Sequence, residues 1–226
     1  MPLHCLNSMR IGIDFDNTLI CYDALFVQAA QPWLPAQCPA EGWHKGTIRD
    51  HIRQLPQGEL TWQRLQAQVY AHRLQQAPPK AGAWLALQRF SQHQFALVIV
   101  SHKSQYARQD PQRIDLRQGA LTWLTRHQFF TLPGLTPQQV YFEATRDEKI
   151  ARIAQLECDF FIDDLYEVLT HPGFPATTQG VLLAPQSGGD DPAPYQHFTS
   201  WAALETALMA ATAPLVSLTP MDTPLL

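Results

Sequence analysis

The chain has 226 residues, 46% of them hydrophobic, and a formal net charge of -4 from 16 basic and 20 acidic side chains. This length suits one principal domain with a small accessory one, and charges spread without long runs of one sign disfavour nucleic acid or a membrane surface as a partner. Four cysteines without C-x-x-C spacing argue against a disulfide scaffold and against a zinc site. No apolar stretch reaches the length of a signal peptide or a membrane span. We therefore expect a cytoplasmic protein with a small-molecule substrate.

Four short apolar runs along the chain are predicted to be strands. They cover residues 10–14, 95–100, 159–162 and 180–183, and compact runs of this kind are typical of strands buried on both faces of a parallel sheet. Segments with the apolar spacing of helices lie between them, at 83–90, 116–126 and 148–156. Repeated alternation of strand and helix predicts an α/β fold with a Rossmann-like, doubly wound parallel sheet.

The segment 21–80 interrupts this alternation directly after the first strand. It is rich in Gln, Arg, His and Trp, has helical stretches near 47–55 and 61–76, and ends at Pro78-Pro79, which is typical of a hinge. We therefore predict a core of residues 1–20 and 81–211 and a small α-helical cap of residues 21–80. Residues 186–194 are predicted to be a loop, 199–211 a closing helix and 212–226 a loose tail.

Polar side chains follow three of the predicted strands. Asp14 and Asp16 follow the first, Ser101 the second, and Asp163 and Asp164 the third. Ligand sites of open α/β sheets lie at the carboxyl ends of the strands, so these residues should converge. Four carboxylates at one edge would raise one another's pKa unless a cation lies among them, and oxygen ligands without Cys or His suit Mg²⁺. Because Mg²⁺ in such sites commonly binds a substrate phosphate as well, the cluster indicates phosphoryl chemistry.

Phosphoryl transfer also needs a positive charge beside the transferring group. Lys149 begins the predicted helix that leads into the strand at 159–162, and could supply it. Arg146 and Arg152 lie close enough in sequence to be alternatives.

The motif I-D-F-D-N-T-L, at residues 13–19, resembles the D-x-D-x-T-L first motif of the haloacid dehalogenase-like (HAD) superfamily of phosphohydrolases. V-I-V-S at 98–101 resembles the second motif, Lys149 the third, and F-I-D-D at 161–164 the fourth. The order and placement of the four are more specific than any one alone. The resemblance implies a HAD-like core with a cap that governs substrate choice.

The resemblance also implies roles for individual residues. Asp14 would attack phosphorus and become a transient aspartyl phosphate, and Asp16 would protonate the leaving oxygen and then activate water. Thr18 would hold the loop at the substrate, Ser101 would donate to a phosphoryl oxygen, and Lys149 would offset negative charge. An acid at position 16 is typical of the phosphatases and phosphotransferases of the superfamily and is absent from its dehalogenases, so dehalogenation is disfavoured.

The magnesium ligands implied by the resemblance are Asp14, Asp163 and the main-chain carbonyl of Asp16, with Asp164 binding the ion directly or through another ligand. Four basic side chains are candidates for contact with the rest of the substrate. They are Lys45 and Arg49 in the cap, and His102 and Lys103 beside Ser101.

Each of these patterns alone has an ordinary structural interpretation. Asp, Asn, Ser and Thr after a strand are common turn and helix-cap residues, and charged side chains on a cap helix are commonly solvated. It is their combination, in order and at strand ends, that favours a site.

The sequence thus predicts a Mg²⁺-dependent phosphomonoesterase acting on a small phosphorylated metabolite through an aspartyl phosphate. A phosphotransferase with the same intermediate and a non-catalytic phospholigand-binding or scaffold protein of the same fold stay open as alternatives. The identity of the substrate and the oligomeric state are not predicted.

Overall fold

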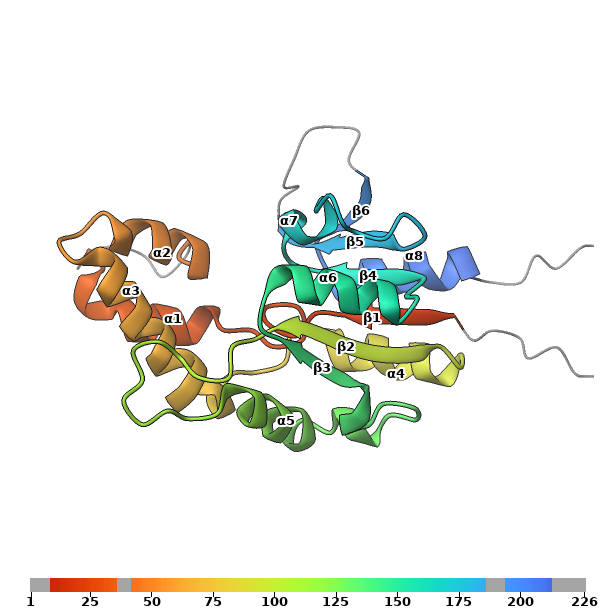
Figure 1. The fold of residues 1–226 in the computed structure, drawn as a ribbon, viewed down its shortest axis with the longest axis horizontal. Coiled ribbons are helices and arrows are strands. Elements are labelled where there is room, and N and C mark those ends of the chain that lie inside the picture. Colours follow the sequence, from red (N-terminus) through yellow and green to blue (C-terminus); the bar gives the residue numbers. More distant parts are fainter. Residues whose placement is uncertain (1–8, 36–41, 186–193, 213–226) are drawn as a thin grey trace, which may run out of the picture.

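The computed structural model describes residues 9–35, 42–185 and 194–212. Its centre is a six-stranded sheet in the order β3-β2-β1-β4-β5-β6, in which every neighbouring pair is parallel (Figure 1). The strands are β1 (Arg10–Ile13), β2 (Ala96–His102), β3 (Val140–Glu143), β4 (Phe160–Asp163), β5 (Gln179–Leu183) and β6 (Tyr195–Phe198). The predicted α/β fold is therefore confirmed.

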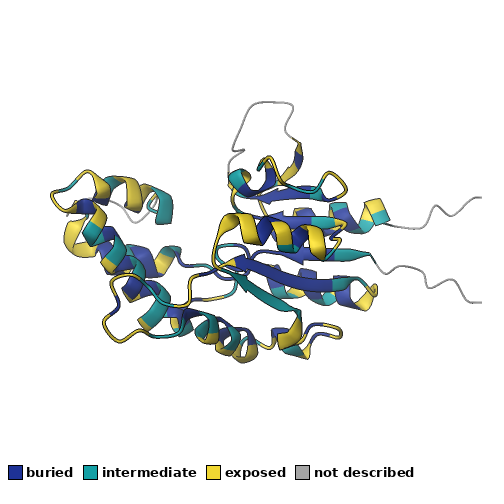
Figure 2. Ribbon diagram, in the orientation of Figure 1, coloured by how far each residue is buried: buried dark blue, intermediate teal, exposed yellow. Residues whose placement is uncertain are grey.

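Helices cover both faces of this sheet, as a doubly wound fold requires. Those that follow residue 80 are α4 (Ala83–Gln92), α5 (Leu116–Arg126), α6 (Arg146–Gln155), α7 (Tyr166–Leu169) and α8 (Trp201–Thr212), with short turns η4 (Phe129–Thr131) and η5 (Pro137–Gln139). Helices α4 and α8 pack together on one face, and α6 and α7 lie on the other (Figure 1). Buried residues are concentrated along the sheet between these layers (Figure 2).

Alternating side chains of the central strands supply the two layers of the core. Ile11 and Ile13 belong to the buried cluster that includes α4 and α8, whereas Val98 and Val100 of β2 belong to the cluster formed with α6 and α7. Gly12 faces this second cluster, where an added Cβ would lie 2.5 Å from a ring carbon of Phe161. Glycine is therefore required there by close packing.

The four predicted strands are observed, but β3 and β6 were not predicted. Both are four-residue strands at the edges of the sheet. The residues of β3 are only half-buried, and β6 has the sequence Y-Q-H-F with two exposed polar residues at its centre. Edge strands bury too little apolar surface to show the continuous apolar runs of the central strands.

The segment that follows β1 forms a separate group of helices beside the carboxyl end of the sheet (Figure 1). These elements are α1 (Asp23–Ala30), η1 (Gln31–Trp33), α2 (Lys45–Arg53), α3 (Gly58–Ala67), η2 (Gln68–His72) and η3 (Leu74–Gln76). The helical stretch predicted at 61–76 is therefore divided into three pieces. After α3 ends, the chain forms the π-helical segment η2 and then the 3₁₀ turn η3. The group has an aromatic centre, in which Phe26 stacks on Trp62 at 5.1 Å between ring centroids.

The two chain segments that join this helical group to the core lie side by side. Cys21 N donates to the carbonyl of Pro78 at 3.0 Å, and Lys80 N donates to that of Leu19 at 2.7 Å. The indole of Trp123 in α5 also donates to the carbonyl of Ala77 at 2.8 Å. These contacts support the proposal that residues 21–80 are a cap inserted between two adjacent points of the core.

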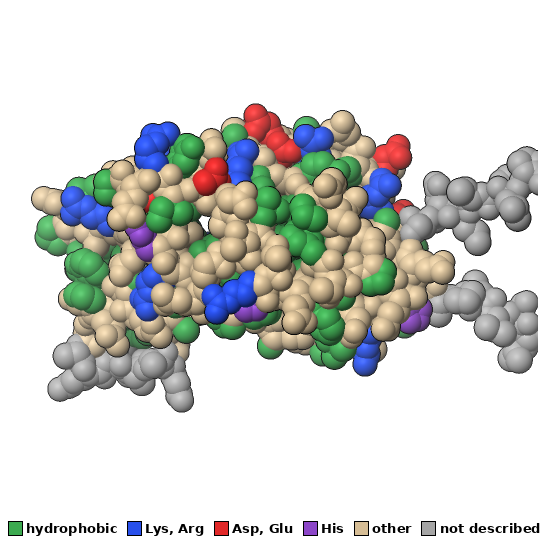
Figure 3. Space-filling model, turned by 90° about the horizontal axis from the view of Figure 1, so that it is seen from below, with side chains coloured by type: hydrophobic (Ala, Val, Ile, Leu, Met, Phe, Trp, Pro, Cys, Tyr) green, Lys and Arg blue, Asp and Glu red, His purple; other side chains and the backbone are tan. Residues whose placement is uncertain are grey.

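Some predictions fall on parts of the chain that the structure does not describe. Residues 186–193 of the predicted loop and residues 213–226 of the predicted tail lie outside the described residues. No described helix has the length and apolar character needed to cross a membrane. On the face drawn in Figure 3, the described Lys and Arg side chains are scattered among neutral ones and do not form one broad patch.

Candidate active site

The chain turns sharply after β1 and carries Asp14 and Asp16 at the carboxyl end of the sheet. Asp14 still donates its main-chain N–H to the carbonyl of Ile162 on β4 at 2.9 Å. The carbonyl of Phe15 then accepts the N–H of Leu19 at 3.0 Å, and Asn17 between them has φ of +62°. Asn is among the residues that tolerate this left-handed conformation best, so the turn is encoded locally.

Helix α6 brings Lys149 to Asp14. The helix begins with a capping box, in which the Thr145 hydroxyl accepts the N–H of Glu148 and the Glu148 carboxylate accepts the N–H of Thr145. One turn in, the buried Lys149 Nζ donates to Asp14 Oδ1 and to Asp163 Oδ2, both at 2.6 Å. The ten residues of α6 fit the short interval between Lys149 and Asp163.

The two arginines that sequence spacing left as alternatives lie elsewhere. Arg152 pairs with Glu143 at 2.7 Å, and Arg146 lines the rim of a cavity without an ion pair among the described residues. Of the three basic side chains, Lys149 is therefore the one in contact with Asp14.

Asp14, Asp163 and Asp164 form an acidic cluster in which one carboxylate oxygen of each lies within 4.8 Å of the others. Desolvation, and then the charges of Asp163 and Asp16, raise the pKa of Asp14 to about 6 despite the opposing effect of Lys149. Desolvation and the charges of Asp163 and Asp14 raise the pKa of Asp164 to about 8. Within the described part of the chain, Lys149 is the one cation paired with this cluster, so ionisation of all three carboxylates would leave two negative charges unbalanced.

The cluster therefore fits a divalent cation by charge and by chemistry. Three carboxylates and no Cys or His are the donor set that Mg²⁺ prefers, and a bound cation would lower the pKa values that desolvation raises. The Asp16 side chain lies outside this cluster, which leaves its main-chain carbonyl as the ligand that the motif resemblance implies.

Asp16 has different neighbours from Asp14. Both of its carboxylate oxygens accept from the buried Lys103 Nζ, at 2.8 and 2.9 Å, and the Tyr22 hydroxyl donates to Oδ1 at 2.7 Å. Although desolvation acts to raise the pKa of Asp16, Lys103 and Tyr22 hold it below its usual value. Lys103, predicted to contact substrate, lies instead against Asp16. Tyr22 was not predicted, because it belongs to no recognisable motif.

Ser101 and Asp14 line the same cavity, and the Ser101 hydroxyl is available to a ligand there. The side chain is buried, and its Oγ has no hydrogen-bond partner among the described residues. It lines a cavity of about 250 Å³ together with Asp14, Asp16 and Lys149. Buried hydroxyls normally have partners, so a ligand in this cavity would supply the missing one.

The other predicted site residues lie around this cavity, which we call the inner cavity. His102 and Lys45 line it, and the ring of His102 also contacts the carbonyl of Ala144 at 3.0 Å. Thr18 is buried beneath it; its hydroxyl is 3.5 Å from Asp14 Oδ2 and its carbonyl accepts from the Trp201 indole at 2.9 Å. Thr18 therefore lies where it can hold the loop, but it does not line the cavity.

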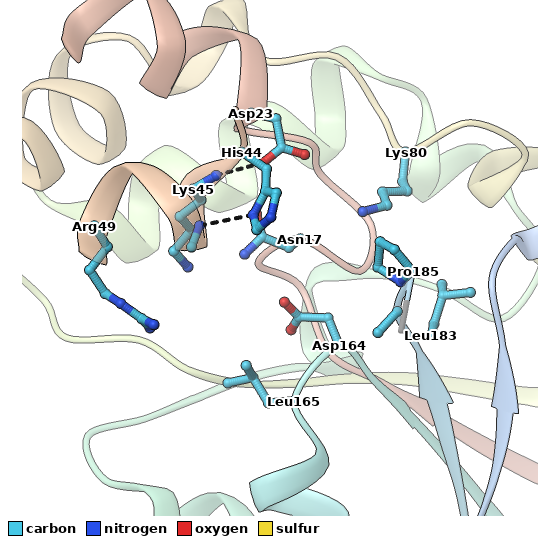
Figure 4. A pocket seen from close by; sticks show the side chains of 12 residues that line it. Asn17, Asp23, His44, Lys45, Arg49, Lys80, Asp164, Leu165, Leu183 and Pro185 are labelled. Carbon is cyan, nitrogen blue, oxygen red and sulfur yellow. Dashed lines mark hydrogen bonds between the residues drawn. The ribbon is translucent and has the colours of Figure 1, made fainter. Parts of the chain in front are cut away.

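A second, larger hollow of about 450 Å³ adjoins the first, between α2 and the core (Figure 4). We call it the outer cavity. Its lining includes Lys45 and Arg49, the candidates from the 21–80 segment, together with His44 beside them. It also includes Lys80, which sequence analysis did not propose. Lys80 comes from the segment that returns from the cap, and only the fold brings it close to α2.

Comparison with known proteins gives structural matches but no match by sequence. No protein-family model matches the chain, and no curated protein matches it significantly. Solved structures do match, at low identity. A haloacid dehalogenase-like hydrolase from Streptococcus pneumoniae matches with a TM-score of 0.58 and 12% identity, over 89% of this chain and 98% of that one.

Two further matching structures contain bound ions, one of them phosphate and sodium and the other magnesium. A HAD family hydrolase from Deinococcus radiodurans, with bound phosphate and sodium, matches with a TM-score of 0.53 and 17% identity over 90% of this chain and 96% of that one. A HAD-hydrolase from Bacillus subtilis, bound to magnesium, matches with a TM-score of 0.53 and 12% identity over 89% and 98%. Dehalogenases are among the matches as well. The fold expected from the motifs is thus confirmed: this chain has the fold of the haloacid dehalogenase-like hydrolases.

Proposed function

We propose that the chain is a Mg²⁺-dependent phosphomonoesterase that hydrolyses small phosphorylated molecules through an aspartyl phosphate on Asp14. One observation carries the proposal: Asp14 and Asp16 line the same inner cavity but are held in different ways. Asp14 contacts Lys149, and Asp16 contacts Lys103 and Tyr22. Two carboxylates with distinct electrostatic surroundings are what separate nucleophile and acid–base roles require.

In the first step a carboxylate oxygen of Asp14 attacks phosphorus, and the bond from phosphorus to the leaving oxygen breaks. Asp16 must be protonated for this step, although Lys103 and Tyr22 favour its ionised form, and it gives that proton to the leaving oxygen, so the product alcohol departs neutral. The Ser101 hydroxyl donates to a phosphoryl oxygen and Lys149 offsets the growing negative charge. Lys103 holds the Asp16 carboxylate in place through hydrogen bonds to both of its oxygens.

In the second step water attacks the phosphorus of the aspartyl phosphate. Asp16, now ionised, takes a proton from that water, phosphate leaves, and Asp14 is regenerated as a carboxylate. The low pKa of Asp16 beside Lys103 favours the ionised form that this step uses.

A magnesium ion would be held by Asp14, Asp163, the main-chain carbonyl of Asp16, and Asp164 directly or through another ligand. When bound, it would neutralise charge on the phosphoryl group. The solved relatives in fold are described with phosphate or with magnesium, which supports this assignment. Hydrolysis of a carbon–halogen bond has no use for an acid beside the nucleophile, so Asp16 favours the phosphatase reaction.

The test is phosphate release from a panel of phosphorylated metabolites, with Mg²⁺ and with a chelator. We expect metal-dependent release by the wild-type protein and none by Asp14→Asn, which loses the nucleophile and little volume. Asp147→Asn is the matched control, since Asp147 is exposed and its ion pair within the described ranges is with His171. Wild-type rates in Asp14→Asn would remove Asp14 from its role. Mg²⁺ binding without any turnover would favour a phosphotransferase lacking its acceptor, or a non-catalytic binding protein.

A further inference from the structure

The outer cavity has a markedly cationic lining. Lys45 and Arg49 reach it from α2, and Lys80 reaches it from the core side. Figure 4 shows the Arg49 guanidinium and the Lys80 ammonium on opposite sides of the same hollow, with Lys45 between them. Cations gathered from two separate segments around one hollow would repel one another unless an anion enters it.

These cations are poorly matched by protein carboxylates. Lys80 has no ion pair among the residues that the structure describes. In the described part of the chain the one ion pair of Arg49 is with Asp50, through Nε at 2.8 Å, and both side chains are exposed, so this pair is weak. Its two terminal nitrogens therefore stay available to a ligand.

Two carboxylates also line the cavity, but each has another partner. Asp23 accepts the main-chain N–H of Lys45 at 3.1 Å and so caps the start of α2. Asp164 belongs to the acidic cluster assigned to the metal. With Asp164 balanced by a cation, the remaining carboxylate is Asp23, and it faces three basic side chains, those of Lys45, Arg49 and Lys80. The cavity therefore favours an anion.

The outer cavity adjoins the inner one. Lys45, Asn17, Asp164 and Leu165 line both. A molecule with its phosphoryl group at Asp14 would therefore extend past Lys45 into the outer cavity. There it would meet the apolar side chains of Leu165, Leu183 and Pro185 as well as the basic ones. This lining suits a short carbon skeleton that ends in a charged group.

From this arrangement we infer that the outer cavity binds a second anionic group of the substrate. The substrate class is then a small phosphomonoester that carries a further carboxylate or phosphate. Lys80 binds that group from the segment that returns to the core and Arg49 binds it from α2, so its binding also holds α2 against that segment. This inference rests on the proposed function, because it takes the inner cavity as the phosphoryl site.

The test compares ligands that differ only in the second group. One pair is 3-phosphoglycerate and glycerol 3-phosphate, and a second is fructose 1,6-bisphosphate and fructose 6-phosphate. Their dissociation constants are measured by calorimetry on full-length Asp14→Asn protein in Mg²⁺, so that binding does not depend on turnover. We expect the member with the second anion to bind about tenfold more tightly in at least one pair, as a charge-assisted contact would give. The pair that shows the preference tells carboxylate from phosphate.

Substitutions added to this protein locate the effect. Lys80→Gln and Arg49→Gln should each reduce the preference by about threefold or more, since each removes one cation from the cavity. Arg53→Gln is the control, because Arg53 lies on the same helix but is exposed and pairs with Glu59 outside the cavity. Equal affinity within both pairs, no measurable binding of the ligands with two anionic groups, or a preference that survives both cavity variants would overturn the inference.

Failure of this inference is distinguishable from failure of the proposed function. Turnover by the wild-type protein without any preference between pair members would remove the anion subsite and leave the phosphatase intact. A binding preference that depends on Lys80 and Arg49, in a protein that releases no phosphate from any ligand, would keep the subsite and remove the phosphatase.

Discussion

At the scale of single residues, identical side chains differ in chemistry because their neighbours differ. Asp14 and Asp16 are two residues apart, yet desolvation and nearby carboxylates raise the pKa of Asp14 to about 6, whereas Lys103 and Tyr22 hold that of Asp16 below its usual value. The motif identifies both as acids. The motif resemblance, and not these shifts, assigns the nucleophile to Asp14. A cation bound at the acidic cluster would lower the pKa of Asp14 and favour the ionised form that attacks phosphorus.

Replacing Asp16 with Ala should cut turnover by about 10²- to 10⁴-fold, which is the usual contribution of acid–base catalysis. The measurement is kcat for phosphate release at saturating substrate and Mg²⁺. Asp50→Ala, which removes an exposed carboxylate on α2, is the control. A loss of only a few-fold would mean that another group carries the proton.

Replacing Ser101 with Ala should separate activity from stability. The lost hydroxyl has no partner among the described residues, so the free energy of unfolding in urea should stay the same or rise by up to about 1 kcal/mol. kcat/KM should fall by about tenfold or more, since a hydrogen bond to a charged phosphoryl group is lost.

Ser91→Ala provides the contrast for this prediction. Ser91 is also buried, but its hydroxyl donates to the carbonyl of Pro133 at 2.7 Å. Its replacement should therefore lower the unfolding free energy by about 1 kcal/mol and leave kcat/KM as it was. If Ser101→Ala behaved like Ser91→Ala, the hydroxyl would have a structural partner and no part in binding phosphate.

At the scale of elements, helix α6 serves the site through its first turn. Thr145 caps the helix and Lys149 follows one turn later, with its N–H donated to the Thr145 carbonyl at 3.1 Å. A cap that frays would release the turn that holds the Lys149 ammonium against Asp14 and Asp163. Local helix stability and the charge balance of the site are therefore linked.

Thr145→Ala should lower the free energy of unfolding by about 0.5 to 2 kcal/mol, the usual cost of losing an N-cap side chain. Turnover should fall as well, because Lys149 loses its fixed position. Urea unfolding and phosphate release measure the two effects. Thr122→Ala on α5, where the exposed hydroxyl donates within the helix to the Gln118 carbonyl at 2.9 Å, should change neither by much. Equal effects of the two substitutions would show that the capping box does not matter to the site.

At the scale of the whole molecule, the acidic cluster couples metal binding to folding. A ligand that binds only the folded chain at a hundred times its dissociation constant stabilises by about 2.7 kcal/mol, or roughly 5 to 10 °C in Tm for a domain of this size. Mg²⁺ should therefore raise the Tm of the wild-type protein by several degrees. Asp164→Asn should reduce this gain, whereas Asp147→Asn should keep it. An equal rise in Tm in both variants would mean that Mg²⁺ binds at a site that does not include Asp164.

The pH dependence of stability without metal follows from the same cluster. The pKa of Asp164 is about 8 in the folded chain and near 3.8 when the chain unfolds, so the folded state retains a proton that the unfolded state releases. Stability from this group is fully present below pH 4 and is lost as pH rises towards 8. In chelator, the Tm of the wild-type protein should thus fall over this range by more than that of Asp164→Asn. Parallel curves for the two proteins would show that Asp164 is ionised throughout.

The residue pattern was enough to predict the central strands, the helices that follow them and the order of the site residues. Apolar runs and helical spacing are local signals, and the carboxyl ends of parallel strands must meet, so Asp14, Ser101 and Asp163 were predictable neighbours. Three features could be recognised from the fold alone: the edge strands β3 and β6, the contact of Lys103 with Asp16 across 87 residues, and the approach of Lys80 to α2. These depend on how distant segments pack, because a lone Lys or Tyr has the same local signal whether it meets solvent, a substrate or a carboxylate from another strand.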